Sequence, residues 1–168
     1  MSNAGIRTAL EGATAYLTEH PDEARYTDTE ARAVLSDGLA VTVSGPDGVG
    51  VATDMAKSVG GGASGPSPGW LLRAAQASCL ATFVAMRAAQ QGVDLGRIEV
   101  IVDSESDDRG TLGLDDSLPA GPLSTRARVR VERDTTQAAD IVRWAEAHCP
   151  VQDAIRRAVP STVELSAG

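Results

Sequence analysis

Two cysteines are the residues of this 168-residue chain whose chemistry stands out. Cys79 lies within an apolar stretch, and Cys149 comes much later, directly before Pro150. They form no CxxC motif and have no neighbouring metal-ligand pattern, so the sequence predicts no metal site. A permanent disulfide is unusual in a reducing compartment. Two interpretations stay open, namely two buried and unreactive thiols or a redox-active pair.

Cys149 has the more reactive setting of the two cysteines. Proline is common at the first position of a helix, so Cys149 followed by Pro150 predicts a helix start with the cysteine as N-cap. The helix dipole and the free backbone N–H groups there favour a thiolate. His148 is adjacent in sequence and is a candidate helper. Cys79, in contrast, lies mid-helix among Ala, Leu and Phe, and a disulfide with Cys149 requires Cα atoms within about 7 Å.

The helices that would position these thiols have clear start and stop signals. Residues 6–20 predict a short helix that Pro21 ends. Ser67 is the predicted N-cap of a long helix that runs to Gln91, with Gly92 as its C-cap. This helix is apolar on nearly every side, which predicts burial on all sides and therefore a second copy of the chain to cover it.

A third helix is predicted after a cap at residues 134–136, ending near His148. A fourth runs from Cys149 to about Val159.

Strand-like runs fall into two groups. Residues 31–35, 39–44 and 48–53 are separated by turns that contain Asp-Gly and predict an antiparallel meander. Residues 97–105 predict another strand, followed by an acidic, Gly-rich loop. Residues 123–133 alternate apolar residues with arginines, which predicts a half-buried strand with a basic outer face.

Residues 162–165 are predicted as a closing strand. Because strands and helices are grouped rather than alternating, the expected fold class is α+β and not a parallel doubly wound fold.

Composition limits the classes of partner. The net charge is −8 and the pI about 4.7, which argues against nucleic acid and anionic membrane surfaces. No signal peptide and no stretch of about 18 apolar residues is visible, so we expect a cytoplasmic protein. Aromatic residues make up only 3%, so the core must consist of Ala, Val, Leu and Ile. Residues 1–4 (MSNA) have the character of a cloning remnant and carry no fold prediction.

One further string, GGGASG at residues 60–65, fits GxGxxG. Prolines separate it from the following helix, so it cannot form the phosphate cradle of a dinucleotide site, and a flexible loop is expected. No organic cofactor is predicted.

Two segments resemble the OsmC-like family of osmotically inducible and organic-hydroperoxide-resistance proteins. Residues 66–79 (PSPGWLLRAAQASC) resemble the motif in which Pro begins a long helix that carries the first cysteine. Residues 148–151 (HCPV) resemble the second motif, a Cys-Pro-Val segment at a helix start. The resemblance covers about residues 31–165. We therefore expect an OsmC-like domain at residues 29–168, preceded by a helical arm at residues 1–28.

The resemblance implies an intertwined homodimer, with antiparallel sheets wrapped around the long central helices, and thiol peroxidase activity towards organic or lipid hydroperoxides. Cys79 would be the peroxidatic residue and Cys149 the resolving residue. A dithiol reductant would restore both thiols, and no cofactor would be needed.

The sequence departs from the hydroperoxide-resistance pattern at two places. Gly69 stands where those members carry Glu, and their catalytic Arg has Arg32 and Arg25 as nearest substitutes, of which Arg32 is the predicted helper. These departures favour an alternative, a non-catalytic small-ligand-binding or redox-sensing protein on the same scaffold.

Overall fold

The computed structural model describes residues 2–166, which divide into two compact units. One unit contains Gln76–Val102, the residues from Arg126 onward and the first residues of the chain. The other contains Thr8–Ala75 and Asp103–Thr125. The fold is α+β, with small antiparallel sheets and one long helix, as the sequence predicts. No described helix is long and apolar enough to cross a membrane.

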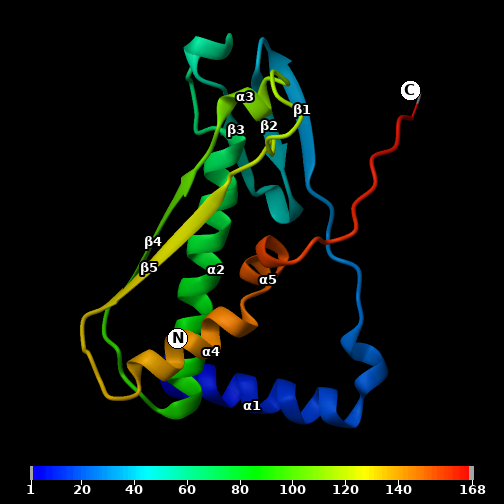
Figure 1. Cartoon of the computed structure of the whole chain (residues 1–168). Helices are drawn as coiled ribbons and strands as arrows, with labels where there is room; N and C mark the ends of the chain where they lie inside the picture. The colour runs from blue at the N-terminus through cyan, green and yellow to red at the C-terminus, as the bar shows by residue number, and fades with distance from the viewer. Residues whose placement is uncertain (1, 167–168) are drawn as a thin grey trace. The chain divides into compact units, whose positions relative to one another are not determined.

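The first sheet is the predicted meander. Strands β1 (Arg32–Asp37), β2 (Ala40–Ser44) and β3 (Gly50–Thr53) pair antiparallel in that order (Figure 1). Gly38 has a φ of 54°, which the tight turn between β1 and β2 requires and which glycine adopts without strain. Every residue of β1 is exposed in the single chain.

The loop after β3 is organised around a buried carboxylate. Asp54 accepts hydrogen bonds from the N–H groups of Met55, Gly62 and Ser64 at 2.7–3.0 Å and from the Ser64 hydroxyl at 2.8 Å. These bonds hold the pKa of Asp54 below its usual value. A side chain at Gly61 would overlap the Met55 carbonyl. The glycine-rich string is therefore a loop, as expected, and two of its N–H groups are directed at one carboxylate.

Helix α2 (Pro68–Gln91) has the predicted bounds. Ser67 caps it, since its Oγ accepts a hydrogen bond from the Trp70 N–H at 3.2 Å. At the other end Gly92 has a φ of 69° and donates its N–H to the Ala89 carbonyl at 3.1 Å. Both capping residues act on neighbours within three positions, which explains why the ends of this helix could be predicted from the sequence.

Helix α2 is covered along one stripe in the single chain. Its buried residues are Gln76, Leu80, Val84, Ala88 and Ala89. Near the other end Trp70 remains 48% exposed and Leu72 is also exposed. Burial of the remaining sides by a second copy of the chain stays a prediction.

The N-terminal helix α1 (Asn3–Glu19) starts three residues earlier than predicted. The Ser2 side chain accepts a hydrogen bond from the Gly5 N–H at 3.3 Å. The helix therefore starts among the first four residues, for which no fold is predicted from the sequence. A 3-10 turn, η1 (Pro21–Ala24), follows. Arg7 anchors the beginning of α1, because its Nε donates to the Ala89 carbonyl of α2 at 2.9 Å.

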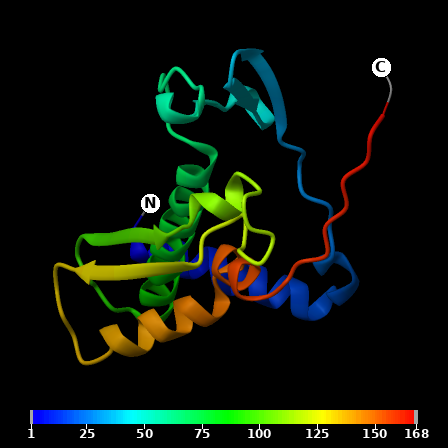
Figure 2. The same cartoon turned by 45° about the horizontal axis from the view of Figure 1, so that its top comes forward.

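Strands β4 (Ile98–Glu105) and β5 (Ser124–Val131) form a two-stranded sheet and lie side by side in Figures 1 and 2. The burial of β5 alternates strictly, with its arginines outward as predicted. The acidic loop between the strands differs from the prediction because it includes a short helix, α3 (Asp108–Thr111), which Asp107 caps. Two further 3-10 turns, η2 (Pro46–Gly48) and η3 (Lys57–Val59), lie in the loops around β3.

Helices α4 (Ala138–His148) and α5 (Pro150–Arg156) complete the fold. The predicted cap at residues 134–136 is wrong: α4 begins at Ala138 without a side-chain cap, and the Thr135 hydroxyl is buried without a partner among the described residues. Helix α5 ends earlier than expected. Residues 162–165 form no strand, and Val163 and Leu165 are fully exposed.

The core of the first unit packs α2, α4 and the inner face of β4 and β5 together. As the low aromatic content predicts, it is built of small and aliphatic side chains: Leu80, Val84, Ala88, Val93, Leu95, Ala138, Ile141, Ala145 and Cys149. Partly buried residues of both strands pack against this cluster, among them Ile98, Val100, Val129 and Val131.

The Asp54 carboxylate gives a prediction for acid stability. Because its folded pKa lies below the usual 3.8, its contribution is fully present above that value and is lost as the pH falls through the lowered folded-state pKa. We expect Asp54→Asn to lower the urea midpoint at pH 7, with a gap from wild type that narrows below pH 3.8. Asp28→Asn, at an exposed loop position, is the control. A gap that is constant with pH would contradict this role.

Candidate functional site

Cys79 and Cys149 are brought together in the first compact unit. Cys79 lies on α2 and is half-buried, while Cys149 lies between α4 and α5 and is 0% exposed. Both are free thiols. Both belong to one hydrophobic cluster, and Cys79 is close enough to raise the pKa of the Cys149 thiol. Whether the two sulfurs form a disulfide stays a prediction.

Cys149 occupies the predicted position, but its acidity is opposite to the expectation. It is the N-cap of α5, with extended backbone angles. Burial raises the pKa of the Cys149 thiol most, and the hydrogen bond to Cys79 raises it further. The N–H groups of Gln152 and Val151 lower this pKa, as a helix start should, although neither makes a hydrogen bond of normal geometry with the sulfur. The predicted thiolate is therefore wrong for the reduced pair.

Two glutamines accompany the thiols, and the sequence analysis missed their role. Gln76 is 1% exposed, and its Nε2 donates to Oε1 of Gln152 at 2.7 Å. Gln76 stands three residues before Cys79, and Gln152 stands three residues after Cys149. The sequence does contain a signal for this role. Gln76 lies three positions before Cys79 in a mostly apolar helix, and residues three apart lie on the same face of a helix.

His148 belongs to an aromatic cluster. Its Nδ1 lies 2.7 Å from the Trp144 carbonyl oxygen, and its ring stacks on the Trp144 ring at 4.1 Å between centroids. Because a carbonyl only accepts, Nδ1 carries the proton in this contact. Phe83 stacks on Trp144 at 6.5 Å, and the Arg87 guanidinium lies 4.8 Å from the Trp144 ring centroid. His148 is exposed, and these contacts fix its ring on α4.

Arg32 is in the second compact unit, at the start of β1. Its guanidinium is 3.6 Å from the Glu30 carboxylate, and its side chain is 72% exposed. Gly69 has open space around it, since an added Cβ would come no closer than 3.8 Å to the Ser67 hydroxyl. The roles of Arg32 and His148 as helpers stay predictions.

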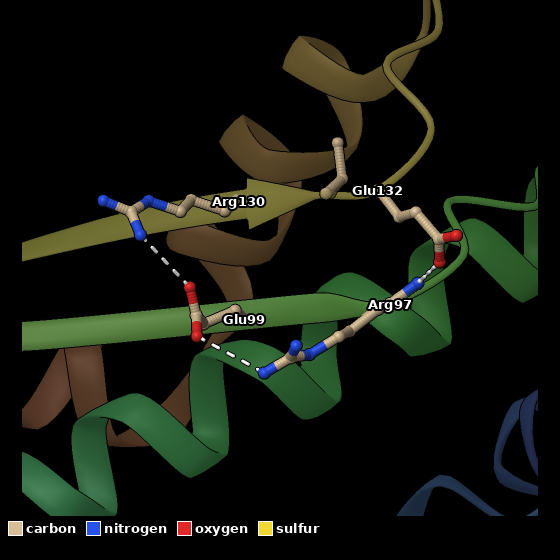
Figure 3. A pocket seen from close by; sticks show the side chains of 5 residues that line it. Arg97, Glu99, Arg130 and Glu132 are labelled. Carbon is tan, nitrogen blue, oxygen red and sulfur yellow. Dashed lines mark hydrogen bonds and ion pairs between the residues drawn. The ribbon is translucent and has the colours of Figure 1, made fainter.

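A shallow pocket on the outer face of β4 and β5 is a separate feature. It has a volume of about 460 Å³ and is lined by Arg97, Glu99, Arg130, Val131 and Glu132. Figure 3 shows its charged side chains paired with one another: Glu99 lies 3.5 Å from Arg97 and 3.4 Å from Arg130. These ion pairs satisfy the charges within the sheet, so the thiol pair remains the candidate site. Among residues 2–166, no three His, Cys, Asp or Glu side chains are arranged to hold a metal ion.

Comparisons with known proteins bear on the family and on the fold. The sequence model of the family described as OsmC-like protein matches residues 60–164. No curated protein sequence matches the chain.

Solved structures show the same fold. An OsmC-like protein from Mycoplasma pneumoniae has a TM-score of 0.66 at 14% identity, over 80% of this chain and 91% of that chain. The organic hydroperoxide resistance protein OsmC from Legionella pneumophila has a TM-score of 0.59 at 20% identity, over 79% and 91%. An organic hydroperoxide resistance protein from Elizabethkingia anophelis also has a TM-score of 0.59, at 16% identity, over 79% and 90%.

The contact between the thiols predicts how the acidity of Cys149 responds to its neighbour. Removing the partner in Cys79→Ala should lower the Cys149 pKa, because both contributions of Cys79 raise it. Burial, the largest cause, remains in the variant and still raises this pKa, opposed by the N–H groups of Gln152 and Val151. The pH dependence of the Cys149 Cβ chemical shift measures both effects. An identical titration curve in Cys79→Ala and wild type would show that the two thiols do not interact.

Proposed function

Because the chain belongs to the OsmC-like family, we propose that it is a thiol-dependent peroxidase, which reduces organic hydroperoxides through Cys79 and Cys149. The observation that carries the proposal is that both thiols pack in the core of the first unit, where Cys79 is close enough to raise the pKa of Cys149. Similar folds that are named organic hydroperoxide resistance proteins support the substrate class.

The exposure of the two cysteines supports the proposed roles within the pair. Cys79 is partly exposed, whereas Cys149 has no exposed surface, so a peroxide meets Cys79 first. Cys149 is held protonated by burial and by its contact with Cys79, which raise its pKa. A protonated, buried thiol is a poor first nucleophile but is well placed to react with a neighbouring sulfenic acid.

The reaction divides into two steps. In the first, the Cys79 thiolate attacks one oxygen of the hydroperoxide ROOH, the O–O bond breaks, and the alcohol ROH leaves after taking a proton, so that Cys79 becomes a sulfenic acid. In the second, the Cys149 sulfur attacks the Cys79 sulfur, and the hydroxyl leaves as water with the thiol proton. The product is a Cys79–Cys149 disulfide.

A dithiol reductant then completes the cycle. It returns two electrons and two protons and becomes a disulfide itself. The reducing cytoplasm is the compartment we expect for such a cycle, because it supplies thiols and keeps structural disulfides rare.

The helpers keep their predicted roles within this proposal. Arg32 would supply positive charge for the thiolate and the peroxide, and it would have to leave Glu30 to do so. His148, next to Cys149 in the sequence, would act as a proton carrier, since Nε2 is the accepting ring nitrogen in the tautomer whose Nδ1 donates to Trp144.

A redox sensor or a binding protein on the same scaffold is the second candidate. The observation that favours it is the exposure of Arg32 and its pairing with Glu30. A cysteine without a nearby cation reacts slowly with peroxide. Such a protein would still oxidise its cysteine pair, or bind a small ligand near Cys79, without turning over.

Turnover of tert-butyl hydroperoxide with a dithiol reductant tests the peroxidase. We expect wild type to turn over and Cys79→Ser to lose activity by orders of magnitude, as when other catalytic nucleophiles are removed. Cys149→Ser should accumulate a sulfenic acid on Cys79, which a dimedone-type reagent traps. Arg32→Gln should lose activity, while Arg97→Gln, on the outer face of β4 and β5, should not. Stoichiometric oxidation without turnover in wild type would instead establish the sensor.

We also propose that the protein is a homodimer, with residues 1–28 as a helical arm on the domain of residues 29–168. Trp70 and Leu72 of α2 and Val34 and Leu35 of β1 are large apolar side chains exposed in the single chain. Covering them would remove apolar area from water, at about 25 cal/mol per Å². A second copy of the chain is the partner that the apolar helix predicts.

Sedimentation equilibrium tests the dimer. Wild type should have twice the chain mass of 17.3 kDa, and a variant with both Trp70→Glu and Leu72→Glu should sediment as a monomer, because a charge in a closed apolar interface is strongly unfavourable. Leu165→Glu, in the exposed C-terminal segment, is the matched control and should remain dimeric. A wild type that sediments at the mass of one chain would overturn the proposal.

A further inference from the structure

The pair of glutamines beside the thiols has a function of its own. We propose that the hydrogen bond between Gln76 and Gln152 is a positioning contact, which holds the start of α5 against α2 so that Cys149 can close a disulfide with Cys79. This inference rests on the redox pair of the proposed function, but it concerns disulfide closure and not the reaction with peroxide.

The two contacts run in parallel between the same two helices. Cys79 follows Gln76 by three residues on α2, and Gln152 follows Cys149 by three residues at the start of α5. Residues three apart lie on one face of a helix, about one turn from each other. The glutamine bond and the thiol contact therefore form two neighbouring links, and any rotation of α5 that breaks one displaces the other.

Burial makes the glutamine link directional. Gln76 is 1% exposed, among the largest fully buried side chains of the chain, and burying an amide is unfavourable unless it is hydrogen-bonded. At 2.7 Å its bond to Gln152 is short. A thiol–thiol contact is weakly directional in comparison, so the amides define the alignment of the two helices more sharply than the sulfurs do.

Gln152 acts on Cys149 through the backbone as well. Its side chain reaches α2, while its own N–H faces the Cys149 sulfur and lowers the pKa of that thiol. The same residue thus ties the position of α5 to the environment of the sulfur that must attack. Arg156 makes a different polar contact from α5: it donates to the Glu146 carbonyl at 3.0 Å and joins α5 to α4 instead of α2.

The variants Gln152→Glu and Gln152→Asp form a matched pair. Both place a carboxylate in the first turn of α5, where the helix dipole favours negative charge, so both should fold. Glutamate matches glutamine in length and can accept the Gln76 Nε2 hydrogen bond, whereas aspartate is one methylene shorter and does not reach. Gln76→Met removes the bond from the α2 side at similar volume. Arg156→Gln is the control that loosens α5 elsewhere.

The measurement is the equilibrium of the full-length protein with reduced and oxidised glutathione. Glutathione disulfide takes two electrons and two protons from the pair, giving the Cys79–Cys149 disulfide and two reduced glutathiones. The ratio of oxidised to reduced protein, at known concentrations of reduced and oxidised glutathione, gives the effective concentration of one thiol at the other. We expect it to be about tenfold lower in Gln152→Asp than in Gln152→Glu, and about tenfold lower in Gln76→Met than in wild type, the scale of one hydrogen bond.

The control sets the limits of the interpretation. Arg156→Gln should stay within about twofold of wild type, because its bond is exposed. Equal effective concentrations in the Glu and Asp variants, or an equal loss in Arg156→Gln, would overturn the positioning role. If one variant does not fold by circular dichroism, the comparison from the other side of the bond decides in the same way.

The outcome is separable from that of the proposed function, because glutathione replaces peroxide as the oxidant. If the protein fails to reduce hydroperoxides but the effective concentration differs between Gln152→Glu and Gln152→Asp, the positioning role is supported. If the protein is a working peroxidase and the two variants have equal effective concentrations, the positioning role is contradicted.

Discussion

The buried stripe of α2 is the constraint on which the rest of the first unit depends. Gln76, Leu80, Val84 and Ala88 recur every four residues and are all buried. Because neighbours at this spacing share one face of a helix, the stripe fixes which way α2 faces α4, where Ile141 and Ala145 have no exposed surface. Cys79 lies beside this stripe, partly covered. The direction in which the Cys79 side chain points is thus set by the packing of the core and not by its neighbours in the sequence.

Cys149 receives its position from two helices at once. It ends α4, where its N–H donates to the Ala145 carbonyl at 2.9 Å, and it begins α5, where its carbonyl accepts from the Asp153 N–H at 2.9 Å. The backbone on both sides of the thiol is therefore hydrogen-bonded. With the Gln76–Gln152 bond alongside, the disulfide that we propose would close with little further loss of conformational entropy.

The parts of the fold that are encoded locally were the parts that could be predicted. Ser67 and Gly92 mark the ends of α2 by capping chemistry, and the alternation of β5 follows from one face being buried. Features that depend on tertiary packing were not accessible. The helix start at Cys149 predicts a thiolate, but burial and Cys79 reverse the direction of the pKa shift. Residues 162–165 have β-prone side chains yet form no strand in the described structure.

The sequence alone predicts part of the candidate site. Both cysteines are identified by type and setting, whereas the contribution of Gln76 and Gln152 becomes clear only when α2 and α5 are seen to meet. Asp54 was missed for a related reason, since its loop partners Gly62 and Ser64 show their role only through the N–H groups that they direct at one carboxylate. Polar residues in apolar or glycine-rich surroundings were the signal in both cases.

The central claim, that Cys79 and Cys149 are one redox pair, is tested most directly by intact-mass spectrometry of the reduced protein after one equivalent of an organic hydroperoxide. The account predicts a loss of two hydrogens per chain, disappearance of both free thiols together, and a single cross-linked peptide that joins Cys79 to Cys149. A chain that keeps both thiols, or that gains oxygen on one cysteine while the other stays reduced, would contradict it.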